Sequence, residues 1–137
     1  MASAVPVIIG VADVVNRSTK VEDAREPVDL MHQAIIDAIN DTGLIAQATT
    51  LQSAIDSIDI VNTWTWPYPD LPGLLSKKLG VDAKHRLLSP HGGNQPGLLF
   101  DEAAKRITLG QTKVAVVTGG EALASCMVPS PGMSREC

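Results

Sequence analysis

The residues best placed to do chemistry form a glycine-rich turn between an apolar run and an amphipathic run. The sequence over 85–97 is His-Arg-Leu-Leu-Ser-Pro-His-Gly-Gly-Asn-Gln-Pro-Gly. In α/β enzymes, such a turn commonly presents a nucleophile at the N-terminus of a helix. The turn that follows Ser89 contains no cysteine and no further serine; its four residues are His91, Gly92, Gly93 and Asn94. The pattern is therefore that of an enzyme without its reactive side chain.

Each of these four residues has a chemical interpretation and a structural one. His91 could act as a base or polarise a carbonyl, and Asn94 could donate a hydrogen bond to a carbonyl, so both are candidate catalytic residues. The backbone N–H groups of Gly92 and Gly93 could bind an oxyanion or a phosphate, so both are candidate cofactor-binding residues. Alternatively, the histidine hydrogen-bonds the turn, the asparagine caps a helix and the glycines permit a tight bend. Both interpretations stay open.

Aromatic residues and one glutamate supply further candidate contacts. Trp64, Trp66 and Tyr68 could stack on an acyl or adenine group, or they could cover a contact between subunits or domains. The second interpretation is favoured because indoles are common at interfaces. Glu121 follows the pair Gly119-Gly120, and we expect it to anchor a loop.

Alternating strand and helix patterns must position these residues. Apolar runs predict four strands, at 5–12, 58–64, 86–89 and 114–118. Helical spacing predicts helices from Glu26-Pro27 to Asp41, over 50–57, around Leu74–Leu79, and from the turn to Gly110. Strands that alternate with helices predict an α/β fold, with a mixed, mainly parallel sheet and helices on both faces.

The helix after the turn is predicted in more detail. Its inward side is expected to consist of Leu98, Leu99, Ala103 and Ile107. The charged residues occupy the other side, where Asp101 precedes Lys105 and Glu102 precedes Arg106 by four positions. This spacing predicts two ion pairs on a solvated surface.

Composition limits the classes of partner. The 137 residues suffice for one domain with a buried core, and only 3% are aromatic, so that core must be aliphatic. The net charge of −4 argues against a nucleic-acid partner, which requires a basic face. No apolar run reaches about 18 residues, so no membrane span is expected. The N-terminus lacks the basic region of a secretory signal, and the cytoplasm is the predicted compartment.

The C-terminal residues differ in character from the rest. Residues 124–137 have no sustained period and contain two prolines, so we expect an irregular tail, or the mark of a truncation, after a domain at 1–123. The tail contains Cys126 and Cys137, and no Cys/His set has metal-ligand spacing, so no metal site is expected. A small sheet with an exposed edge needs cover. The chain is therefore predicted to be part of a larger protein, or one partner of an assembly.

The order of these patterns resembles the N-terminal half of thiolases. Val7-Ile-Ile-Gly-Val-Ala lies near the start, and Glu26-Pro-Val-Asp-Leu-Met leads into the first helix. Lys113-Val-Ala-Val-Val-Thr-Gly-Gly-Glu-Ala follows the helix after the turn. The resemblance covers 5–123 and is greatest to the branch of sterol-carrier-protein thiolases and acetyl-CoA acetyltransferase homologues. It implies a five-layer αβαβα architecture of two similar halves, dimerisation, and acyl transfer between coenzyme A thioesters.

The resemblance also locates the missing group. Active thiolases carry a cysteine at the start of a buried helix, where the helix N-terminus favours the thiolate that attacks the acyl thioester. The matching position here is Gly93, which cannot form an acyl-enzyme. The family's other working groups, a Gly-His-Pro histidine, an Asn-Glu motif and a Cys-x-Gly cysteine, belong to its C-terminal half, beyond the end of this chain. Covalent acyl-CoA chemistry by this chain alone is therefore not expected.

Two functions follow from the resemblance. The first is an acetyl-CoA acetyltransferase-like protein, active as an enzyme only with a separate C-terminal half or by noncovalent chemistry, and otherwise inactive. The alternative is a noncatalytic subunit that binds an acyl-CoA or a partner within a larger assembly. An acyl-CoA thioester is the expected ligand in either case, with no other cofactor, and a homo-oligomer or pairing with a C-terminal half is expected. The ending Ser-Arg-Glu-Cys is not a peroxisomal signal of the Ser-Lys-Leu type.

Overall fold

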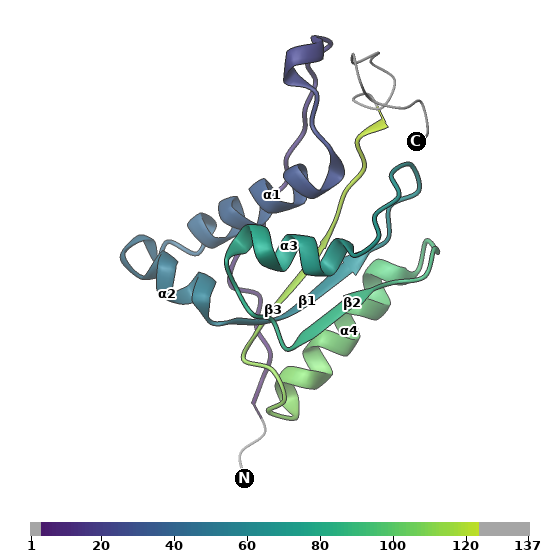
Figure 1. Cartoon of the computed structure of the whole chain (residues 1–137). Helices are drawn as coiled ribbons and strands as arrows, with labels where there is room; N and C mark the ends of the chain where they lie inside the picture. Colours follow the sequence, from purple (N-terminus) through teal and green to yellow (C-terminus); the bar gives the residue numbers. More distant parts are fainter. Residues whose placement is uncertain (1–3, 124–137) are drawn as a thin grey trace.

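The computed structural model describes residues 4–123, which form a small parallel sheet with helices on both faces (Figure 1). The helices are η1 (Val21–Asp23), α1 (Pro27–Asp41), η2 (Ile45–Gln47), α2 (Ala48–Ser53), α3 (Leu71–Leu79) and α4 (Gln95–Thr108). The strands are β1 (Ile55–Val61), β2 (His85–Leu88) and β3 (Val114–Gly119). The predicted tail at 124–137, including Cys126 and Cys137, lies outside the described residues.

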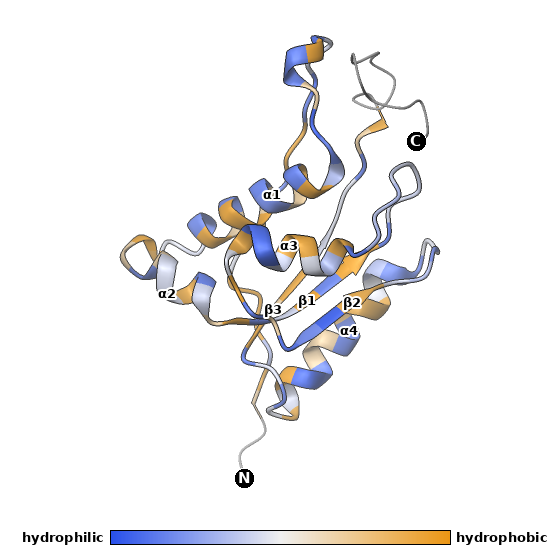
Figure 2. Cartoon of the chain, viewed as in Figure 1, coloured by the Kyte–Doolittle hydropathy of each residue, from blue (hydrophilic) through white to orange (hydrophobic). Residues whose placement is uncertain are grey.

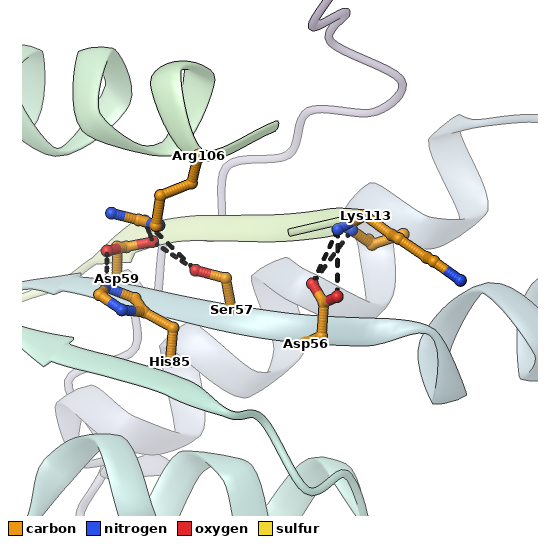
Figure 3. A network of polar contacts seen from close by, with 7 residues as sticks. Asp56, Ser57, Asp59, His85, Arg106 and Lys113 are labelled. Atoms are coloured by element: carbon orange, nitrogen blue, oxygen red, sulfur yellow. Dashed lines mark hydrogen bonds and ion pairs between the residues drawn. The ribbon is translucent and has the colours of Figure 1, made fainter. Parts of the chain in front are cut away.

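The central strand β1 lies between β2 and β3, and it pairs with both in parallel. Asp59 is opposite Leu87 on one side and opposite Val117 on the other. At the start of β3, the carboxylate of Asp56 accepts hydrogen bonds from the backbone N–H groups of Lys113 and Val114, at 3.0 and 3.2 Å (Figure 3). This contact lies next to an irregularity in the β1–β3 register. The α/β fold is confirmed, and every strand pair of the described part is parallel.

The two faces of the sheet are covered differently. Ile58 and Ile60 of β1 are fully buried in an aliphatic core with residues of α1 and α3. Ser57 and Asp59, which alternate with them along the strand, face α4 and hydrogen-bond to its Arg106. Figure 2 shows that α1 and α3 carry both hydrophobic and hydrophilic residues, as expected for helices with one buried side.

The helix ends follow from local sequence. Pro27 and Pro72 occupy the first turns of α1 and α3, and the Asp70 carboxylate caps α3 by accepting a hydrogen bond from Gly73 N–H at 2.9 Å. Gly80 and Gly110, with φ of +67° and +70°, close α3 and α4. After each glycine, the next N–H reaches back to a carbonyl of the last turn, which is the Schellman arrangement. The predicted ends at Pro27, Gly80 and Gly110 are confirmed, whereas α3 begins at Leu71, earlier than the predicted start around Leu74.

The first predicted strand, at 5–12, is not present. The segment is extended but pairs with no strand, and its larger side chains are exposed, with Val5 81% and Val7 71% accessible. A run of branched aliphatic residues shows only that a segment would gain from burial. Strand formation also needs a neighbouring backbone, and a cavity separates this segment from β3.

Two other boundaries differ from the prediction. The helix predicted over 50–57 is α2 and ends at Ser53, and the strand predicted at 58–64 begins at Ile55. The reason is that Ile55 is buried in the core, where strand pairing with Val114 outweighs the weak helical spacing. Within the described part of the chain, no helix is long and apolar enough to cross a membrane.

Candidate functional site

The predicted turn lies where the parallel strands end. Because β1, β2 and β3 run in the same direction, their following loops gather at one edge of the sheet, the usual place for sites in such folds. The loop after β1 carries the tryptophans, the loop after β2 is the glycine-rich turn, and Glu121 follows β3. The structure therefore brings the candidate residues of three separate segments together.

His91 is held by the loop after β1. Its Nε2 lies 2.8 Å from the carbonyl oxygen of Thr63, and because a carbonyl only accepts, this nitrogen carries the proton. The imidazole also stacks on the indole of Trp64, with ring centroids 4.2 Å apart. His91 is therefore hydrogen-bonded to the loop after β1 rather than to a residue of its own turn.

The two glycines and the asparagine of the turn do not have the backbone conformation or the capping hydrogen bond that their structural interpretations suggest. Neither Gly92 nor Gly93 has a positive φ, so the turn does not use the left-handed conformation open to glycine. A Cβ added at Gly93 would meet nothing within 4 Å, whereas one added at Gly92 would lie 3.0 Å from the Asn94 Oδ1. Asn94 occupies the N-cap of α4 as predicted, but its side chain makes no capping hydrogen bond.

The hydroxyl that directly precedes the turn is not available. Ser89 is 2% exposed, and its Oγ accepts a hydrogen bond from Asn62 N–H at 3.1 Å and donates one to the carbonyl of Pro90 at 2.7 Å. The hydrogen bond from Asn62 joins the loops after β1 and β2, while the one to Pro90 lies within the loop after β2, so the hydroxyl is used both as acceptor and as donor. No side chain of the turn itself, at 91–94, carries a thiol or a hydroxyl.

Glu121 anchors the third loop, as predicted. Its carboxylate accepts a hydrogen bond from the backbone N–H of Trp64 and another from the hydroxyl of Thr65. The end of β3 is thereby tied to the loop after β1. The Trp64 indole, held between this anchor and His91, remains 71% exposed and offers a free apolar surface at this edge.

Tyr68 joins the same loop to the start of α1. Its hydroxyl donates to Glu26 Oε2 at 2.9 Å and accepts from Val28 N–H at 3.2 Å. Burial of the phenol, reinforced by the hydrogen bond to Glu26, raises the pKa of Tyr68 well above its usual value. This aromatic residue is therefore a structural link to α1 rather than part of a stacking surface.

The raised pKa of Tyr68 predicts a loss of stability in alkali. In the unfolded chain the phenol ionises at about pH 10, whereas in the folded chain it keeps its proton to higher pH. The unfolded state therefore binds fewer protons above pH ~10, and the free energy of unfolding falls as the pH rises. Urea unfolding at pH 8 and at pH 11 should show a larger loss for the wild type than for Tyr68→Phe. Equal losses would contradict the assigned role.

A buried charge cluster fixes α4 on the sheet (Figure 3). The fully buried carboxylate of Asp59 accepts hydrogen bonds from Arg106 Nη2 at 2.5 Å and from Ser57 Oγ at 3.0 Å. His85 Nε2 lies 3.1 Å from the other carboxylate oxygen. Since α4 begins at the turn, this cluster helps to hold the turn in place. Sequence reasoning missed it, although an aspartate between two isoleucines of an apolar strand signals a buried charge that needs a partner.

The cluster corrects the predicted surface of α4. Asp101 and Lys105 form the predicted ion pair at 2.6 Å, but Arg106 turns inward to Asp59 instead of pairing with Glu102. Leu98, predicted to face inward, is 46% exposed, while Leu99 and Ala103 are buried. The buried carboxylate offers Arg106 a stronger interaction than a solvated one, and this rotates the inward side of the helix.

The side chains at this edge of the sheet are better suited to binding a ligand than to covalent catalysis. It offers one histidine, one asparagine amide, an exposed indole and the N-terminus of α4. Among residues 4–123, no three His, Cys, Asp or Glu side chains converge as metal ligands would. Such a set can orient a carbonyl or an anion and can stack on a flat group, but it offers no thiol for a covalent acyl intermediate.

Comparison with known proteins gives a consistent result. No family model and no curated protein matches the sequence. The structure is similar to that of a monomeric SCP2-thiolase-like protein type 1 from Mycobacterium smegmatis, with a TM-score of 0.67 and 26% identity over 82% of this chain. It is also similar to an acetyl-CoA acetyltransferase from Syntrophomonas wolfei, with a TM-score of 0.60 and 21% identity over 81% of this chain.

The match covers only part of each of these proteins. The matched part of this chain covers 22% of the first protein and 27% of the second. The chain therefore has a thiolase-like α/β fold, as its sequence resemblance predicts.

Proposed function

We propose that this chain is a noncatalytic part of a thiolase-like acyl-CoA protein, and that it forms no acyl-enzyme at the turn before α4. The observation that carries the proposal is the chemistry of that turn. Gly93 lies two residues before the first residue of α4, and His91 is hydrogen-bonded to the Thr63 carbonyl. The hydroxyl of the preceding Ser89 is buried and makes two hydrogen bonds. The thiolase-like fold supplies the context in which a nucleophile is expected there.

Covalent acyl transfer would need a step that this turn cannot perform. A thiolate must attack the thioester carbonyl carbon, forming a new carbon–sulfur bond while the bond to the coenzyme A sulfur breaks and coenzyme A leaves as its thiolate. No sulfur atom is present in the turn. Polarisation of the carbonyl by helix N–H groups or by His91 would assist such a step but would not replace the attacking atom.

The proposal is tested by restoring the missing atom with Gly93→Cys. Because nothing lies within 4 Å of a Cβ at this position and its φ is not positive, the new side chain can be placed without strain. The N-terminus of α4 should favour the thiolate form of the introduced thiol. After incubation with acetyl-CoA, intact-mass and peptide analysis should show one acetyl group at position 93 of the variant and none on the turn of the wild type.

Gly93→Ala provides the matched control, since it fills the same space without a nucleophile. A stable acetyl adduct on the wild type, lost in Cys126→Ala or Cys137→Ala, would overturn the proposal, because it would identify a working thiol elsewhere. Failure of Gly93→Cys to react would show that the turn is not equivalent to a nucleophile turn, and this result too would count against the proposal.

A second candidate function is binding of an acyl-CoA without turnover. The exposed Trp64 indole beside the N-terminus of α4 favours it, because an adenine or acyl group could stack there while helix N–H groups receive a phosphate or carbonyl. Calorimetric titration with coenzyme A should give saturable binding that Trp64→Ala weakens about tenfold, a loss of about 1.4 kcal/mol. Phe100→Ala is the control, as it removes another exposed aromatic ring, from α4. Absence of heat with the wild type would eliminate this candidate.

A further inference from the structure

We draw no further inference here: the strongest candidate, the side-chain cluster of Asp59, His85 and Arg106 between the sheet and α4, belongs to the contact already described that fixes α4 on the sheet, where each oxygen of the buried carboxylate has a partner from this chain.

Discussion

Replacing Arg106 with methionine should lower the free energy of unfolding by about 3–5 kcal/mol. The guanidinium lies 2.5 Å from the carboxylate of Asp59, whose side chain is fully buried. Without it, the buried carboxylate keeps only Ser57 and the imidazole of His85 as side-chain partners among the described residues. The measurement is urea unfolding at pH 7, followed by circular dichroism.

Two further variants separate this effect from the loss of a surface charge. Lys105→Met removes the adjacent cation, whose partner Asp101 is exposed, and should change stability very little. The double variant Asp59→Leu with Arg106→Met should recover part of the loss, because it replaces both charges by apolar groups. If Arg106→Met proved as mild as Lys105→Met, the cluster would not be what holds α4 on the sheet.

Replacing Ile58 with alanine should lower the free energy of unfolding by about 2–5 kcal/mol. Ile58 has no exposed surface, and it lies in the aliphatic core between β1 and the helices α1 and α3. Deleting its side chain removes buried apolar contacts and leaves a cavity that the surrounding helices fill only in part. Thermal or urea unfolding measures the loss directly.

Ile8→Ala is the matched control, since it is the same substitution in the other aliphatic run. Ile8 is 66% exposed in this chain, so its replacement should have little effect on the free energy of unfolding. A large loss for Ile8→Ala would mean that 5–12 is a buried strand after all.

The helices, and the ends of the longer ones for the most part, were predictable because their signals act over a few residues. Pro27 starts α1, and Gly80 and Gly110 end α3 and α4 through conformations that depend on the residue itself. The alternation of apolar strands with these helices was enough to predict an α/β fold with helices on both faces. The same applies to the position of the turn, since a helix beginning near Gln95 must follow a loop.

The partners of charged and apolar groups were less predictable, because they depend on segments far apart in the sequence. Spacing alone paired Arg106 with Glu102, but the structure places it against Asp59, 47 positions away. Likewise, the apolar run at 5–12 matched a buried strand, but it pairs with none of the described strands. A sequence pattern shows which conformation and which kind of partner a segment favours. Whether the segment finds that partner depends on the elements that lie next to it in the fold.

By itself, the sequence determined that the turn before α4 has no sulfur or hydroxyl nucleophile, because the presence of such an atom is a matter of covalent composition. It also determined where most helices begin and end, through local backbone preferences. Only the tertiary structure decided that His91 contacts Thr63 and Trp64, that Arg106 neutralises Asp59, and that a cavity borders β3. The physical reason is that these features arise where parallel strands bring distant residues side by side. The spacing of residues within one segment does not determine such contacts.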